Sequence, residues 1–167
     1  TLIFNPATHA AYVIRLWARS SGNSVDSPEN DAALSQTFTL MPRSCPTGQY
    51  LAEFYSNSVL SGAPTFTTCD ATIGYVWLAG ESGNGIGSDN FSVRWTGRFP
   101  FNAGIYNFVA TADDGIRAWI DGNLILDGWI DQAATTYQAA LALSEGEHNV
   151  QVDYYQNGGD ALTQFYW

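Results

Sequence analysis

The sequence predicts an all-β protein with too many short strands for a single open sheet. Residues 91–99 alternate apolar and polar side chains, which is the period of two expected for a strand with one buried and one solvated face. Asp121-Gly122 stands between two apolar runs and indicates a hairpin, because a type I′ turn needs positive φ at both central positions. No segment of helical length shows a convincing 3.6-residue period.

The first 42 residues contain two predicted strands, at residues 12–18 and 36–41. Residues 20–31 between them are polar and rich in Gly, Asn and Pro, which is typical of a loop. An isolated hairpin is only marginally stable in water, so these strands must pack on something. Two interpretations remain open. Residues 1–42 add a pair of strands to the main domain, which we favour, or they are the remnant of a preceding domain.

Residues 43–167 form the predicted main domain. Besides the strand at 91–99, strands are predicted at residues 49–55, 73–78, 106–112, 116–121, 123–127, 135–143, 150–154 and 162–167. Hydrophobic residues make up 46% of the chain, enough for a sizeable core without a metal or disulfide. The scarcity of charged residues and the many glycines suit a loop-rich all-β protein.

The composition also limits the partners. A formal net charge of −10 argues against nucleic acid and anionic membrane surfaces. No apolar run approaches the roughly 20 residues that span a bilayer, so we expect no membrane insertion. The chain begins with Thr1 and shows no signal peptide, so we interpret it as a mature or excised piece of a larger multidomain chain.

Cys45 and Cys69 are the only cysteines. They are either two buried free thiols or a disulfide that closes a loop of about 25 residues, worth on the order of 3 kcal/mol in the chain-entropy model. We favour the disulfide, which implies an exported protein, either secreted or on the cell surface. Two cysteines without suitably placed histidines make a poor zinc site.

Two neighbouring acids, Asp113 and Asp114, follow the strand at 106–112 and precede the next strand. In an extended strand their side chains would point to opposite faces, so the backbone must kink if both are to bind one ion. Calcium takes six to eight oxygen ligands, and the polar segment at residues 157–160 would supply more of them. The alternative is that the two aspartates only end a strand in a turn, and that residues 157–160 are a solvated hairpin loop.

Several blocks of the sequence resemble the PA14 domain. They are FSVRWTG at 91–97, GIYNFVATADDGIRAWIDG at 104–122, ILDGW at 125–129 and VQVDYYQNGGDALTQFYW at 150–167. PA14 is a β-sandwich module named after a bacterial toxin component and also found in adhesins and glycosidases. The resemblance implies an antiparallel β-sandwich of the PA14 type, with the pair of strands in residues 1–42 as an N-terminal addition.

The resemblance also implies a calcium site. In lectin-like PA14 domains the corresponding aspartate pair is joined by a cis peptide, so that both carboxylates face one Ca²⁺. The loop after the VDYY-like strand completes the shell. Transferred to this sequence, the ligands are the carboxylates of Asp113 and Asp114, side-chain oxygens of Asn157 and Asp160, and the carbonyl of Gly158.

Calcium with open coordination positions would bind two vicinal hydroxyls of a sugar. Asp113, Asp114, Asn157 and Asp160 are then expected to contact the sugar, since carboxylates accept strong hydrogen bonds from hydroxyls. We expect Gln156 to serve as a substitute ligand or as a sugar contact. Trp129 is a candidate aromatic platform, although packing in the core is the default for an aromatic residue of a sandwich.

These features predict a calcium-dependent, lectin-like carbohydrate-binding module of a secreted or cell-surface protein, serving adhesion or polysaccharide targeting. The alternative is a structural or protein-interaction PA14 module without sugar binding. We expect no catalysis by this piece, which is compatible with an accessory module of a larger extracellular enzyme. Adjacent aspartates on one metal are not the separated carboxyl pair of a glycosidase, and His9 and His148 are too far apart in the sequence to suggest a triad.

Overall fold

The computed structural model describes residues 44–77 and 86–167, and all the regular structure in these ranges is β-strand. The strands are β1 (Tyr50–Tyr55), β2 (Phe66–Asp70), β3 (Ile73–Trp77), β4 (Phe91–Phe101), β5 (Gly104–Asp113), β6 (Gly115–Ile120), β7 (Asn123–Gly128), β8 (Thr135–Leu143), β9 (Gly146–Gln156) and β10 (Ala161–Tyr166). The strands predicted at 12–18 and 36–41, and their relation to the main domain, lie outside the described residues.

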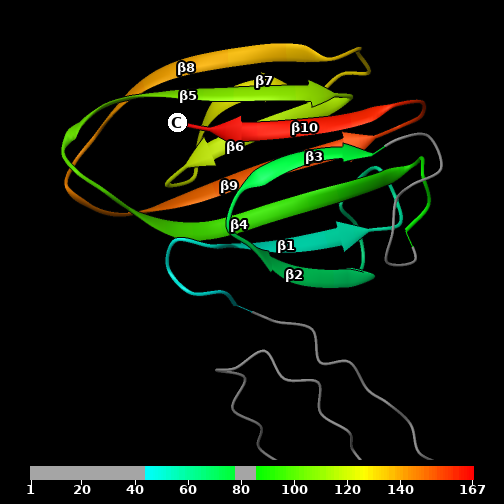
Figure 1. Cartoon of the computed structure of the whole chain (residues 1–167), viewed down its shortest axis with the longest axis horizontal. Helices are drawn as coiled ribbons and strands as arrows, with labels where there is room; N and C mark the ends of the chain where they lie inside the picture. The colour runs from blue at the N-terminus through cyan, green and yellow to red at the C-terminus, as the bar shows by residue number, and fades with distance from the viewer. Residues whose placement is uncertain (1–43, 78–85) are drawn as a thin grey trace, which may run out of the picture. The chain divides into compact units, whose positions relative to one another are not determined.

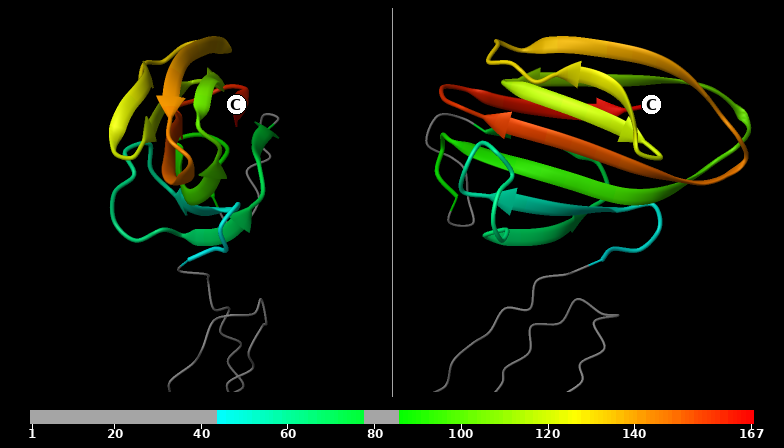
Figure 2. Two further views of the ribbon diagram at one scale, coloured as in Figure 1. Left: turned by 90° about the vertical axis from the view of Figure 1, so that its left-hand side faces the viewer. Right: turned by 180° about the vertical axis from the view of Figure 1, so that it is seen from behind.

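The strands form two antiparallel sheets, which confirms the predicted β-sandwich. One sheet has six strands in the order β2-β1-β4-β9-β6-β7, and the other has four in the order β3-β10-β5-β8. The end-on view in Figure 2 shows the two layers, and the long strands β4, β5 and β9 are prominent in Figure 1. No helix long and apolar enough to cross a membrane occurs in the described ranges.

The core lies between the two sheets. The apolar residues that alternate with polar ones in residues 91–99 point into it. Phe91, Val93 and Trp95 of β4 are at most 1% exposed, whereas Arg94 and Arg98 of the same strand keep more of their surface accessible. A strand with this alternation buries one face and leaves the other to solvent. The outer face of the six-stranded sheet is therefore polar.

The hairpin predicted at Asp121-Gly122 joins β6 to β7. Ile120 pairs with Asn123, so the connection has two residues, and φ is +50° at Asp121 and +78° at Gly122. These positive angles are the ones a type I′ turn requires. The side chain of Asp121 has a further role, because its Oδ2 lies 2.6 Å from Nδ1 of His148.

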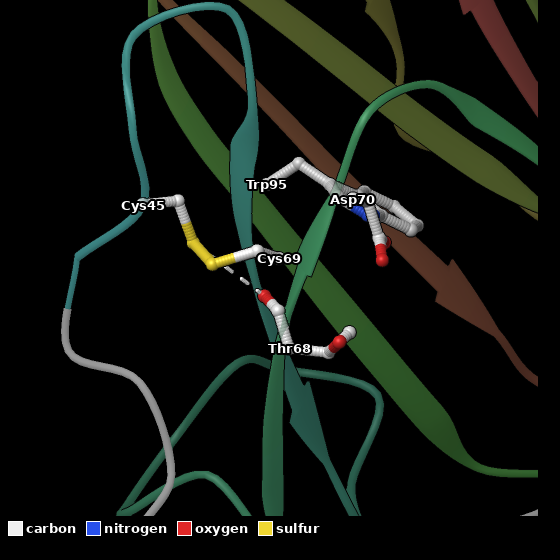
Figure 3. Close-up of a disulfide and its surroundings, with 5 residues drawn as sticks. All are labelled: Cys45, Thr68, Cys69, Asp70 and Trp95. Atoms are coloured by element: carbon white, nitrogen blue, oxygen red, sulfur yellow. Dashed lines mark hydrogen bonds between the residues drawn. A yellow bond between two sulfur atoms is a disulfide. The ribbon is translucent and has the colours of Figure 1, made fainter. Parts of the chain in front are cut away.

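Cys45 and Cys69 form a disulfide with a Cα–Cα distance of 5.7 Å, as predicted. It ties the segment before β1 to β2 (Figure 3). The next residue, Asp70, accepts hydrogen bonds at Oδ2 from Nε1 of Trp95 at 2.9 Å and from the hydroxyl of Tyr75 at 2.7 Å. Since Trp95 and Tyr75 belong to opposite sheets, this carboxylate links the two layers next to the disulfide.

Candidate functional site

Two chain crossings between the sheets lie at the same end of the sandwich. Strand β5 of the four-stranded sheet ends at Asp113, and β6 of the six-stranded sheet begins at Gly115. Residues 157–160 make the return crossing, from β9 to β10. Because Gly115 pairs with Tyr155 and Asp113 pairs with Leu162, the register of both sheets brings the aspartate pair beside residues 157–160.

The aspartate pair has the geometry that the resemblance implied. The peptide bond between Asp113 and Asp114 is cis. Asp114 is 6% exposed, and its Oδ2 accepts a hydrogen bond of 2.8 Å from the backbone N–H of Asn157, while Oδ1 accepts one of 3.1 Å from the backbone N–H of Gln132. The side chain of Asp114 therefore holds residues 157–160 directly against the pair.

Asp113 is more accessible than Asp114 and lies in a field of negative charge. Burial, the charge of Asp114 and, less strongly, the charge of Asp160 raise the pKa of Asp113, against a backbone hydrogen bond from Ala134 that lowers it. Within the described ranges, the ion pairs involve other carboxylates, and none includes Asp113, Asp114 or Asp160. The site is thus a cluster of acids without a basic counter-ion, which favours a cation.

Asn157 is held by a second acid, which the sequence analysis did not assign to the site. Its Nδ2 donates a hydrogen bond of 2.9 Å to Oδ2 of Asp131. The other oxygen of Asp131 accepts one of 2.7 Å from the hydroxyl of Tyr155. This arrangement fixes the amide of Asn157 through its nitrogen, so that its carbonyl oxygen remains the atom for a ligand.

Gln156 is not placed as expected. Its side chain is 0% exposed, its Nε2 donates a hydrogen bond of 3.1 Å to the carbonyl of Asp160, and its Oε1 lies 3.0 Å from the hydroxyl of Tyr154. The same hydroxyl lies 2.5 Å from the carbonyl oxygen of Asp113. A fully buried amide offers no atom to a sugar, so the expected sugar contact is corrected, whereas the role of a substitute metal ligand stays a prediction. Through its hydrogen bond to the carbonyl of Asp160, Gln156 helps to position residues 157–160.

The remaining loop residues are exposed. Gly159 has φ of +92°, a backbone conformation that favours glycine. A Cβ built on Gly158 would lie 4.0 Å from Oδ1 of Asp89, so a further carboxylate, on the segment before β4, approaches the loop. Only the glycine-rich and serine-rich character of that segment was evident in the sequence, and nothing there singled out Asp89.

Trp129 is half-buried and packs within the protein. Its ring lies 4.6 Å from that of Tyr155, centroid to centroid, and the guanidinium carbon of Arg117 lies 5.1 Å from its ring centroid. These contacts support the packing interpretation of Trp129. The ring stabilises Tyr155, and through it Asp131, at the edge of the site.

The donors at this corner fit calcium in kind. They are carboxylate, amide and backbone oxygens, which a hard cation prefers to nitrogen or sulfur. In the described part of the chain, no three His, Cys, Asp or Glu side chains are close enough together to hold a metal. The carboxylates of Asp113, Asp114 and Asp160 therefore do not form a ready-made group of three metal ligands in this structure.

Comparison with known proteins identifies the family of the described sandwich. The model of the PA14 domain matches residues 47–167. The anti-sigma-I factor RsgI3 of Acetivibrio thermocellus is 34% identical over 123 residues, which are 72% of this chain and 19% of that protein.

Solved structures agree with this result. An anti-sigma factor domain-containing protein superposes with a TM-score of 0.65 at 33% identity, covering 72% of this chain and 42% of its own. A PA14 sugar-binding domain from an RTX adhesin superposes with a TM-score of 0.64 at 20% identity, and the match covers 72% of this chain and 89% of that domain. At this level of identity, the similarity shows the fold alone. The chain thus spans about a fifth of the curated relative and less than half of the solved anti-sigma chain.

Proposed function

The chain belongs to the PA14 domain family, and from this membership and the corner at Asp113–Asp114 we propose that it is a calcium-dependent carbohydrate-binding module. One observation carries the proposal: the 2.8 Å hydrogen bond from the backbone N–H of Asn157 to Oδ2 of Asp114. It brings the two segments expected to share an ion into direct contact. The fold shared with a PA14 sugar-binding domain is consistent with this function.

In this proposal the ion is held by oxygens from both crossings. Asp113 and Asp114 supply carboxylates, Asn157 and Asp160 side-chain oxygens, and Gly158 its carbonyl. Calcium binding requires the carboxylates of Asp113, Asp114 and Asp160 to come closer together than they are in this structure. The attraction of a divalent ion favours that movement, since the acids now repel one another.

The sugar binds through the ion and the acids around it. Two vicinal hydroxyls take the open coordination positions of Ca²⁺, and Asp113, the more accessible acid of the pair, accepts a hydrogen bond from one of them. Gln156 and Asp131 hold the loop in place without touching the sugar. The choice among sugars then depends on the conformation of residues 157–160 and on the neighbouring carboxylate of Asp89.

The comparisons suggest where such a module works. Relatives that are 33–34% identical are anti-sigma factors much longer than this chain. We therefore propose that the module is the carbohydrate-sensing part of a longer signalling protein of that kind, displayed outside the cell, where its disulfide is stable. The second candidate is a structural or protein-interaction module, in which the corner holds no ion or an ion fully enclosed by protein.

Thermal unfolding with and without calcium tests the proposal. Calcium at 100 times its Kd stabilises a folded protein by about 2.7 kcal/mol, so the wild type should melt at a higher temperature in calcium than in EDTA. Asp113→Asn should lose this difference. Glu145→Gln is the matched control: it removes the same charge, is exposed, and precedes β9 at the end opposite to the site.

A monosaccharide array in calcium completes the test. The wild type and Glu145→Gln should bind at least one sugar in calcium and none in EDTA, and Asp113→Asn should bind none. A wild type that calcium does not stabilise contradicts the calcium site. A wild type stabilised by calcium that binds no sugar favours the structural module instead.

A further inference from the structure

A groove of about 720 Å³ crosses the outer face of the six-stranded sheet, away from the aspartate corner. Its floor follows one row of cross-strand neighbours: Leu51, Thr96, Gln151 and Trp119, on β1, β4, β9 and β6. The next row, Ala52, Trp95, Val152 and Ala118, is 0% exposed and points into the core. Because successive residues of a strand point to opposite faces, the first row faces outward.

The two walls of the groove are fixed by the fold. On one side runs the segment 44–49, which is held by the disulfide to Cys69 and by a hydrogen bond of 2.8 Å from the N–H of Gly48 to the carbonyl of Arg98. Gly97 allows this close approach, because a Cβ there would meet the carbonyl oxygen of Gln49 at 2.6 Å. On the opposite side the groove is bounded by the hairpin turn at Gly122, next to Trp119 at the end of the floor.

Trp119 is the exceptional side chain of this face. Among the five tryptophans in the described ranges, Trp77, Trp95, Trp129 and Trp167 each contact another aromatic ring. Trp119 is partly exposed, and within those ranges it has no ring contact, no cation above its ring and no hydrogen bond from its indole N–H. A large aromatic surface and a polar tip are therefore both available to a ligand.

The rest of the lining determines the chemistry of that ligand. Gln49, Thr96, Asn149 and Gln151 offer amides and a hydroxyl, and none of the described residues that line the groove is a carboxylate, although the chain has a net charge of −10. Arg98, the one charged residue among the described residues of the lining, forms an ion pair with Glu147. Amides around an unpartnered indole suit a ligand that has apolar ring faces and neutral hydroxyl groups.

We propose that this groove binds an uncharged polysaccharide chain, with a sugar ring stacked on Trp119 and hydroxyls bonded to the amides of Gln151 and Asn149. The row from Leu51 to Trp119 crosses four strands, roughly 14 Å at about 4.8 Å per strand spacing, so it accommodates a short run of sugar units. None of the residues assigned to calcium lines the groove. Binding there is independent of calcium and of the function proposed for the aspartate corner.

Affinity gel electrophoresis of the full chain in EDTA tests this proposal. The probes are soluble neutral polysaccharides (mixed-linkage β-glucan, arabinoxylan and galactomannan), with polygalacturonate as the charged comparison. The wild type should be retarded by at least one neutral polymer and not by polygalacturonate. Trp119→Ala should weaken binding at least about tenfold, as is usual when a central aromatic anchor is removed, and Asn149→Ala should weaken it several-fold.

The controls separate this groove from a folding defect and from the calcium site. Val76→Ala removes an exposed apolar side chain from β3 in the other sheet and should bind as the wild type does, as should Asp113→Asn. Circular dichroism shows whether Trp119→Ala is folded, and the exposed Asn149→Ala repeats the test if it is not. The proposal is overturned if no neutral polymer retards the wild type in EDTA, if only polygalacturonate does, or if folded Trp119→Ala and Asn149→Ala are both retarded as strongly as the wild type.

Discussion

The substitution Gly115→Ala tests how the sandwich positions the candidate calcium site. Gly115 begins β6 and pairs with Tyr155 of β9. A Cβ at this position would lie 2.0 Å from Cε1, 2.6 Å from Cδ1 and 2.8 Å from Cζ of Tyr155. The ring must withdraw by about 1 Å or more to reach an ordinary contact distance, and its hydroxyl then leaves Asp131.

The expected cost has two parts. Overpacking a filled site costs about 1–3 kcal/mol, and loss of the 2.7 Å hydrogen bond from Tyr155 to Asp131 adds about 1 kcal/mol. We therefore expect Gly115→Ala to lower the free energy of unfolding by about 2–4 kcal/mol. Because Asp131 also holds Asn157, calcium affinity should fall about tenfold or more, as is usual when a residue that orients a metal ligand is disturbed.

Urea unfolding in EDTA measures the first effect, and isothermal titration with calcium measures the second. Gly74→Ala is the matched control, because a Cβ on Gly74 meets nothing within 4 Å and the change should stay within about 0.5 kcal/mol. If Gly115→Ala and Gly74→Ala unfold at the same urea concentration and bind calcium equally, the close packing of Tyr155 on β6 does not position the site.

Two further predictions concern the sandwich itself. Replacing Cys45 and Cys69 with serine should lower the free energy of unfolding by about 3 kcal/mol, and an unchanged urea midpoint would contradict a stabilising disulfide. Hydrogen bonding to Asp121 raises the pKa of His148, and the bond from His148 helps to lower the pKa of Asp121 even though burial acts to raise it. The interaction between protonated His148 and ionised Asp121 should stabilise the folded protein fully between about pH 4 and pH 6.5. This stabilisation should fade as the pH rises through the raised pKa of His148. The free energy of unfolding of the wild type should exceed that of His148→Gln by about 1 kcal/mol near pH 5.5 and by less at pH 9. An equal difference at the two pH values would refute a stabilising pair of His148 and Asp121.

Much of the fold could be predicted from local patterns. The alternation at residues 91–99 placed β4, and the Asp121-Gly122 dipeptide placed the hairpin between β6 and β7, because both signals come from neighbouring residues. Strand β2 was missed. Its five residues, Phe66–Asp70, carry no strong alternation, and their strand conformation depends on pairing with β1, a contact that a local pattern does not encode.

The candidate site was predicted in part. The family resemblance placed Asp113, Asp114 and residues 157–160 together, and the register of the sheets brings them there. Gln156 was expected to be a substitute ligand or a sugar contact. Residues 153–156 of β9 are all buried, however, so the alternation of buried and exposed positions fails at this end of the strand. Asp131 was missed as a site residue because it approaches Asn157 from another loop, 26 positions away in the sequence.

The most direct test of the calcium site is the anomalous scattering from a crystal of the chain grown with calcium. We predict one calcium peak between the carboxylates of Asp113–Asp114 and residues 157–160, with at least two of its ligands being water or a soaked sugar. Absence of a peak at this corner, or a peak enclosed entirely by protein oxygens, would contradict a calcium ion that a sugar can reach.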